Sequence, residues 1–204
     1  MDIEFFLKGL LIGLSIAAPV GPIGVLCIRR TLAHGKMVGL VSGLGAATAD
    51  GIYGLIAGFG LTVITNFLIG QHFWIQLIGG CFLCYLGIKT LISKASFSQS
   101  ETQKKNIIGA FLSVLFLTLT NPMTILSFIA IFAGLGISNS GSSIISSVVL
   151  VLGVFCGSTL WWIILSSGVG LFRNRISDKS LTAINRLSGI IILIFGGIAL
   201  YGLM

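Results

Sequence analysis

The chain has very little charge. Only 8% of its 204 residues are Asp, Glu, Lys or Arg, and just five residues are acidic, whereas charged residues make up about 25% of a soluble domain. So few charges cannot cover the surface of a soluble globule of this size. Because 55% of the residues are hydrophobic, the composition indicates an integral membrane protein whose surroundings are the lipid bilayer.

Several functional motifs are also missing. The sequence has no Walker-type phosphate loop, no nucleophile triad and no metal-ligand cluster, so we expect neither an enzyme nor a primary pump, and no cofactor or metal. The net charge of +7 is compatible with nucleic-acid binding, but the basic residues lie in short loops rather than on one helix face. We therefore expect no nucleic-acid partner.

The four cysteines (Cys27, Cys81, Cys84 and Cys156) all fall in apolar segments, which argues against a secreted disulfide framework. Cys81 and Cys84 are one helical turn apart, as in a thiol-redox motif. Membrane thiol-redox carriers use six spans with cysteines, so this function remains as a less favoured alternative. Cysteine also packs well as a small apolar residue.

Six apolar segments meet or nearly meet the length of about 20 residues that a transmembrane helix needs. They cover about residues 5–28, 38–63, 72–92, 107–134, 144–172 and 187–204. The predicted fold is therefore an all-α, multi-pass membrane protein of six helices. The sequence leaves open whether it forms a homodimer.

The basic residues predict the orientation of these six spans. The links after the first, third and fifth spans hold eleven of the twelve Lys and Arg residues, and Lys8 alone lies on the opposite side. By the positive-inside rule, the three links are cytoplasmic and both termini lie outside the cell. The expected location is a bacterial inner membrane.

A polar linker at residues 95–106 divides the chain into an N-terminal three-helix repeat (1–94) and a C-terminal one (107–204). Because three spans is an odd number, the two repeats are expected to be inverted relative to each other. The segment VGPIGVL around Pro22 is followed by the similar TNPMTIL around Pro122, and the alignment of Gly45–Tyr53 with Gly153–Trp161 places Asp50 opposite Ser158.

The unusual residues of four spans are predicted at the same membrane depth. Counting between flanking polar residues places Pro19, Asp50, Asn121 and Ser158 near the middle of their spans. Inverted-repeat transporters place broken helices and their binding site at that depth. A proline frees a carbonyl group four residues earlier, and the new half-helix exposes N–H groups that attract a carboxylate. The candidate substrate-binding residues are Pro19, Gly21, Pro22, Gly24, Asp50, Asn121, Pro122 and Ser158, and the alternative is that the prolines only kink packed helices.

Asp50 is the candidate proton-coupling residue. A charge at the middle of a membrane helix costs about 2.5–3.5 kcal/mol on insertion scales. Burial favours the neutral form of a carboxyl group and a nearby cation favours the ionised form, so a proton and a substrate ammonium group can compete for one carboxyl. The alternative is a protonated Asp50 in a structural hydrogen bond between two helices.

At these residues the chain resembles the LysE/RhtB family of bacterial amino-acid exporters. The matching features are the run GLLIGLSIAAPVGPIGVLCIRRTLAHG, the glycine-rich second span that reaches Asp50, the central hydrophilic linker, and NPMTILSF at residues 121–128. The resemblance implies proton-motive-force-driven efflux of an amino acid, with the family motifs at Gly21 and Pro22, Asp50, and Asn121 and Pro122. Because APVGP replaces the single Gly-Pro of many members, the substrate subgroup stays open.

The function expected from the sequence is amino-acid export by alternating access, coupled to protons at Asp50. A divalent-metal exporter of similar topology is the main alternative. It is less favoured because a hard cation needs several oxygen ligands, and the sequence supplies only one carboxylate at the middle of the membrane.

Overall fold

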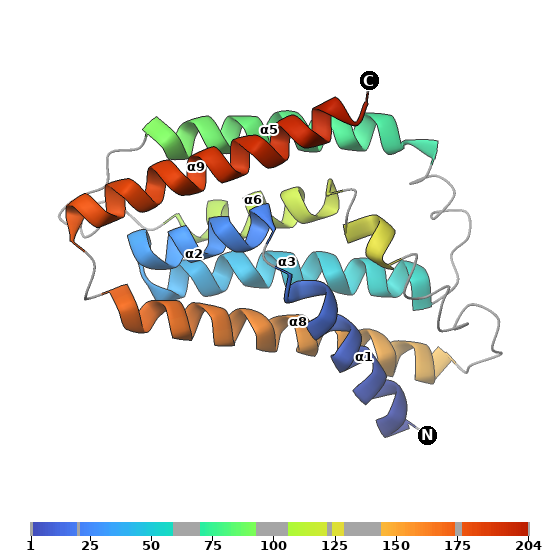
Figure 1. The fold of residues 1–204 in the computed structure, drawn as a ribbon. Helices are drawn as coiled ribbons and strands as arrows, with labels where there is room; N and C mark the ends of the chain where they lie inside the picture. The colour runs from blue at the N-terminus through green and yellow to red at the C-terminus, as the bar shows by residue number, and fades with distance from the viewer. Residues whose placement is uncertain are drawn as a thin grey trace.

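The computed structural model describes residues 2–19, 21–58, 70–92, 106–121, 124–128, 144–173 and 177–203. All regular secondary structure in these residues is helical, as predicted (Figure 1). Residues 124–128 form a short helical segment. The longer helices are α1 (Asp2–Ala17), α2 (Pro22–His34), α3 (Lys36–Gly58), α5 (His72–Ile92), α6 (Ile107–Leu119), α8 (Ile144–Phe172) and α9 (Asp178–Tyr201).

Four of these helices, α3, α5, α8 and α9, are long and apolar enough to cross a membrane. The consecutive helices α1 and α2 make a fifth candidate if the bent pair is one span. The predicted span at 107–134 is described only in part, as α6 and the helical residues 124–128. The helices α5 and α8 have the predicted limits of 72–92 and 144–172.

The predicted start of the last span, at residue 187, is wrong. Helix α9 begins nine residues earlier, at Asp178, and the Ser177 side chain caps it by accepting a hydrogen bond from the Ser180 amide at 3.2 Å. The apolar pattern missed this first part because it is polar. Its buried Asn185 accepts a hydrogen bond from Arg29 Nε at 2.9 Å, so this polar residue has a partner inside the protein.

The proline-rich stretch of the first span breaks the helix. Helix α1 ends at Ala17, helix α2 begins with Pro22 at its first position, and the two are bent by 80°. Proline suits a helix start because an N–H group at that position would have no intrahelical partner, whereas proline disrupts a helix interior.

The predicted basic link after this span is shorter than expected. Arg29 and Arg30 belong to α2, and Gly35, with φ of +95°, is the sole residue between α2 and α3.

The helices form a bundle with α3 near its centre. Helix α3 packs against α6 and α8, α1 packs against α8, and α5 pairs with α9 (Figure 1). The contact between α1 and α8 requires small residues on both helices. A side chain on Gly13 would collide with the Val154 carbonyl oxygen, and one on Gly157 would collide with that of Leu10. Such close backbone approach through small residues is typical of membrane helices.

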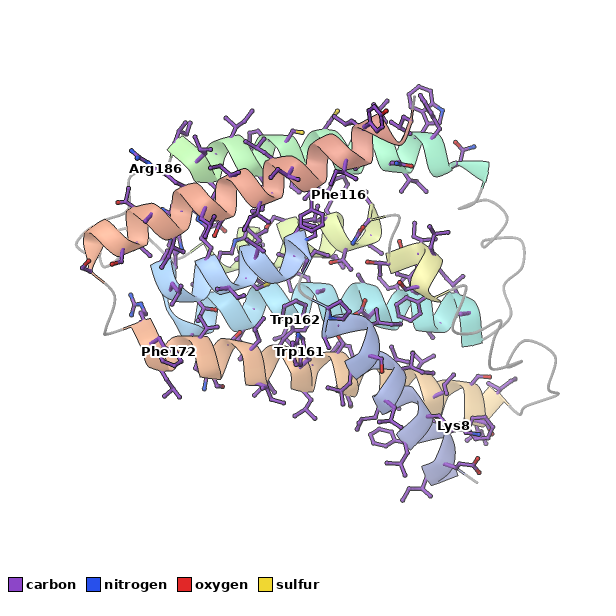
Figure 2. All side chains as sticks on the ribbon, viewed as in Figure 1. Lys8, Phe116, Trp161, Trp162, Phe172 and Arg186 are labelled. Carbon is purple, nitrogen blue, oxygen red and sulfur yellow. The ribbon has the colours of Figure 1, made fainter. Side chains whose placement is uncertain are left out.

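Polar and apolar residues are distributed as expected for a protein surrounded by lipid. Many large apolar side chains project outward, including Ile3, Ile108, Ile144 and Leu171, which are 72–80% exposed (Figure 2). Polar side chains such as Ser42, Asp50 and Ser158 are buried. Lipid can solvate the apolar surface, and these three polar side chains have hydrogen-bond partners inside the protein.

The chain ends and most of the described basic residues lie at opposite ends of the bundle. The start of α1 and the end of α9 lie at one end, where Figure 2 shows Lys8. The end of α2, the start of α3, the ends of α5 and α8, and the start of α9 lie at the other end (Figure 1). These segments carry Arg29, Arg30, Lys36, Lys89, Arg173 and Arg186.

Candidate functional site

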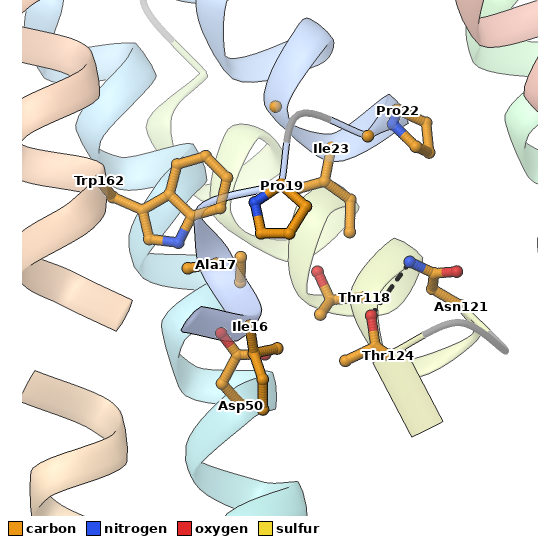
Figure 3. Close-up of a pocket in the computed structure, with 13 residues that line it drawn as sticks. Ile16, Ala17, Pro19, Pro22, Ile23, Asp50, Thr118, Asn121, Thr124 and Trp162 are labelled. Atoms are coloured by element: carbon orange, nitrogen blue, oxygen red, sulfur yellow. Dashed lines mark hydrogen bonds between the residues drawn. The ribbon is translucent and has the colours of Figure 1, made fainter. Parts of the chain in front are cut away.

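A small cavity lies where the chain breaks between α1 and α2 (Figure 3). Its volume is about 70 Å³, less than half of the about 150 Å³ that accommodates benzene in an engineered cavity. In this conformation it therefore has room only for a small group. Its lining comes from the break (Ile16, Ala17, Pro19, Gly21, Pro22, Ile23 and Gly24), α3 (Ala46 and Asp50), the end of α6 and the residues after it (Thr118, Asn121 and Thr124), and α8 (Trp162).

Asp50 supplies the acidic group of the site. Its side chain is 3% exposed, and its Oδ2 accepts a hydrogen bond of 2.7 Å from Ser158 Oγ on α8. An ionised carboxylate can accept about four hydrogen bonds. The single hydrogen bond from Ser158 therefore occupies only one of these acceptor positions. Asp50 therefore keeps acceptor capacity for a ligand in the cavity.

The start of α2 supplies N–H groups. Gly21 is the N-cap residue, and it provides no side-chain hydrogen bond to the first turn. Ile23 and Gly24 of that turn line the cavity. The N-terminus of a helix carries a partial positive charge and N–H groups without intrahelical partners, so this part of the lining favours an anionic group.

The end of α6 and the residues after it form one side of the cavity. Asn121 Nδ2 donates a 3.0 Å hydrogen bond to Thr124 Oγ1, and the Thr124 amide donates one of 3.1 Å to the Asn121 carbonyl oxygen. Figure 3 shows both side chains beside Thr118. Tyr53 of α3 holds this helix end in place, because its hydroxyl donates a 2.6 Å hydrogen bond to the Leu119 carbonyl oxygen.

The structure brings most of the sequence-predicted residues together. Pro19, Gly21, Pro22, Gly24, Asp50 and Asn121 all line the cavity. Ser158 does not line it and acts on it through its hydrogen bond to Asp50. Pro122 lies outside the described residues.

Trp162 and Thr118 line the cavity but were missed by the sequence analysis. A tryptophan in a membrane helix is equally compatible with an interfacial anchor or a core residue, so its type gave no signal. Its position gave one, since it follows Ser158 by four residues and such residues share a helix face. Thr118 precedes Pro122 by four residues, which is the position whose carbonyl a proline leaves unpaired.

The lining suits a small molecule with both a positive and a negative group. Among the described residues that line the cavity, Asp50 is the only one with an ionisable side chain. A ligand ammonium group can contact Asp50, while a ligand carboxylate has only uncharged donors to contact.

The four cysteines of the chain do not contribute to this cavity. All four are free; Cys27 is buried, Cys81 and Cys156 are exposed, and Cys84 is partly buried. None lines the cavity. In the described part of the chain no three His, Cys, Asp or Glu residues come together in a group that could hold a metal ion.

Comparison with known proteins gives a consistent result. A family model described as "LysE type translocator" matches residues 14–202. The chain is 29% identical over 95% of its length to a Bacillus subtilis protein named "Putative amino acid efflux protein YcgF", of which the match covers 93%. It is 26% identical to two uncharacterized membrane proteins, YrhP of Bacillus subtilis (84% of this chain, 87% of that protein) and YahN of Escherichia coli (71% and 65%). No solved structure matches the chain significantly.

The family match covers nearly the whole chain and confirms the resemblance seen in its motifs. The apolar helices agree with a bacterial multi-pass membrane protein, and the family is one of transporters rather than enzymes. This chain belongs to the LysE family of translocators.

Proposed function

We propose that this protein exports an amino acid or a close derivative across the inner membrane, in exchange for protons, by alternating access around the cavity at Asp50. The observation that carries the proposal is the position of Asp50: a buried carboxyl of α3 in a cavity at the break between α1 and α2, lined by segments from both halves of the chain. The efflux function in the name of the similar YcgF protein supports an amino-acid substrate.

In the proposed cycle, the substrate ammonium group binds ionised Asp50 from the cytoplasm, and its carboxylate lies at the start of α2 near Gly21 and Gly24. After the site opens outward, a proton binds Asp50 and displaces the ammonium group. The protonated site then returns and releases the proton inside. A more acidic exterior therefore drives export, because protonation weakens cation binding on the outer side.

Alternating access in many transporters relies on two inverted repeats, and pairs of helix contacts support such a repeat here. Gly45 of α3 packs on α6, where a Cβ atom would lie 2.5 Å from the Phe111 carbonyl oxygen. Gly153 of α8 packs on α1 in the same way, against the Phe6 carbonyl oxygen. An inverted repeat relates α3 to α8 and α6 to α1, so these two contacts are equivalents.

The contact between α3 and α8 is also consistent with an inverted repeat, because the repeat exchanges these two helices. Gly45 and Gly153 are separated by 108 residues in the sequence, as are the hydrogen-bonded residues Asp50 and Ser158. The same offset relates Gly43 to Val151 and Gly54 to Trp162. Gly43 packs against Trp162, and Gly54 packs against Val151. These relations support an approximate two-fold axis near the Asp50–Ser158 hydrogen bond, with three spans on each side of residues 95–106.

The test uses the purified protein in proteoliposomes. Each of the twenty common amino acids, radiolabelled, is offered for counterflow under an imposed pH gradient. The native protein should exchange at least one of them faster when the gradient is present. Asp50→Asn should abolish the pH-driven counterflow, since asparagine is similar in size but cannot take up a proton.

Glu4→Gln is the matched control, because Glu4 is a carboxylate on the surface of α1, paired with Lys8 at 2.7 Å and far more exposed than Asp50. This variant should transport like the native protein. Gel filtration and circular dichroism should show that both variants insert and fold. Unchanged pH-driven exchange by Asp50→Asn would remove Asp50 from the mechanism, and an absence of exchange by the native protein would reject amino-acid export.

A further inference from the structure

We infer that the indole N–H of Trp162 donates a hydrogen bond to the substrate carboxylate and so makes the protein select molecules that carry a free carboxylate. This inference rests on the proposed function and adds to it a residue that determines specificity. It concerns the end of the substrate opposite to the ammonium group at Asp50.

The first observation is a buried donor without a partner. Trp162 is 3% exposed, and its Nε1 atom is buried without a hydrogen-bond partner among the described residues. An indole nitrogen can only donate, and leaving a buried donor unsatisfied is unfavourable. An acceptor bound beside this nitrogen would satisfy it.

The second observation is the direction of the side chain. Trp162 lines the cavity together with Asp50, Gly24 and Thr118. Figure 3 shows its ring extending from α8 toward Pro19, with the nitrogen edge facing the side on which Ala17 lies. Ala17 also lines the cavity, so the N–H edge of the indole lies beside the part of the cavity wall that the end of α1 forms.

The third observation is that neighbouring residues fix the ring. A Cβ atom on Gly43 of α3 would lie 2.5 Å from both Cβ and Cγ of Trp162. Glycine at this position therefore makes the space in which the base of the indole rests. A donor held in a fixed position orients a ligand better than one on a mobile side chain.

A negatively charged hydrogen-bond acceptor fits the indole N–H of Trp162 best. No Lys, Arg or His is among the described residues that line the cavity, so a carboxylate there depends on uncharged donors. The start of α2 at Gly24 is one such donor, and Trp162 is a second. Asp50 is the acidic group of the cavity, and its oxygen accepts from Ser158, whereas Trp162 Nε1 has no such bond. A ligand carboxylate beside this nitrogen would supply the missing acceptor.

The experiment compares each amino acid with its decarboxylated amine. Thermal stabilisation of the purified protein is titrated with the twenty common L-amino acids and with the corresponding amines. Trp162→Phe keeps an aromatic ring but removes the N–H. Its affinity for the amino acid that stabilises the native protein most should fall by about tenfold or more, as expected for a lost hydrogen bond to a charged group. Its affinity for the amine should not change.

Trp161→Phe is the matched control. Trp161 is the neighbouring residue, is partly buried against the core and does not line the cavity. This variant should keep the native preference for amino acid over amine. Incorporation of a benzothiophene analogue of tryptophan at position 162 provides a second variant, because it keeps the two-ring shape and replaces the N–H by sulfur. It should lose the same preference if Trp162→Phe folds poorly.

The outcomes separate the two proposals. If Trp162→Phe and the benzothiophene variant keep the native preference, or bind amino acid and amine more weakly by the same factor, the indole contributes only packing and the inference is wrong. If the native protein is stabilised by amines but not by amino acids, the inference is also wrong. If neither class stabilises or is exchanged by the native protein, the proposed function and this inference both fail.

Discussion

Two side chains of α3 join the central helix to two of its neighbours, α8 and α6. Asp50 accepts a hydrogen bond from Ser158 of α8, and Tyr53 donates one to the Leu119 carbonyl oxygen of α6. Both residues are buried. Any movement of α3 that opens the cavity must therefore break these bonds or carry both neighbours with it.

The hydroxyl of Tyr53 should contribute measurably to stability. Tyr53→Phe removes the 2.6 Å hydrogen bond to Leu119 and leaves that carbonyl group without its side-chain partner at the end of α6. We expect the free energy of unfolding to fall by about 1–3 kcal/mol, the cost of a buried unsatisfied polar group. Unfolding in mixed micelles of mild detergent and SDS measures this. The control is Tyr201→Phe, because Tyr201 is 77% exposed; equal losses in both variants would contradict the assignment.

At this scale the sequence predicts the residues whose chemistry is costly in a membrane. Pro19, Pro22 and Asp50 stand out because each needs a special environment, and all three lie at the cavity. Trp162 could not be identified in this way, since tryptophan is common in membrane helices. Its place in the cavity depends on the space beside Gly43, which is a property of packing between two helices.

Helix α8 contains glycines in two different environments. A side chain on Gly157 would collide with the Leu10 carbonyl oxygen of α1, whereas a Cβ atom on Gly168 would meet nothing within 4 Å. The two positions therefore offer a test of whether α1 and α8 associate by close backbone contact. Both substitutions replace glycine by alanine in the same helix, so the change in helix propensity is the same and a difference between their effects reports on packing.

Gly157→Ala should destabilise the protein, because the methyl group must push α1 away from α8. We expect a loss of about 1–3 kcal/mol, as for overpacking of a core. Gly168→Ala should be neutral or stabilising by up to about 1 kcal/mol, since alanine favours a helix over glycine. Thermal unfolding in detergent measures both. Similar effects of the two substitutions would show that the contact between α1 and α8 tolerates a methyl group.

Element limits were predictable where local chemistry sets them. The break between α1 and α2 follows from Pro19, Gly21 and Pro22, because proline disrupts a helix interior wherever it lies. The start of α9 was not predicted, because hydropathy alone ignores polar residues that find partners in the fold. Ser177 before Asp178 is an N-cap signal that would have located it.

On the scale of the whole molecule, the sequence predicts a helical membrane protein because its composition permits little else. Which helices pack against each other cannot be predicted from composition. That α1 packs on α8 and α3 on α6 depends on glycines that match a backbone distant in the sequence. Single glycines at positions such as 45 and 153 predict close packing but do not say against which helix.

The proposed topology is the property of the whole molecule that is simplest to test. The chain ends lie at one end of the bundle and the described basic residues, except Lys8, at the other (Figures 1 and 2). Since basic loops remain in the cytoplasm, residue 98 in the linker should be inside and residue 140, between the fourth and fifth predicted spans, outside. In a variant without the native cysteines, Ser140→Cys should react with an impermeant maleimide in intact cells. Ser98→Cys should react only after permeabilisation, and the reverse pattern would mean that the proposed orientation, and with it the direction of export, is wrong.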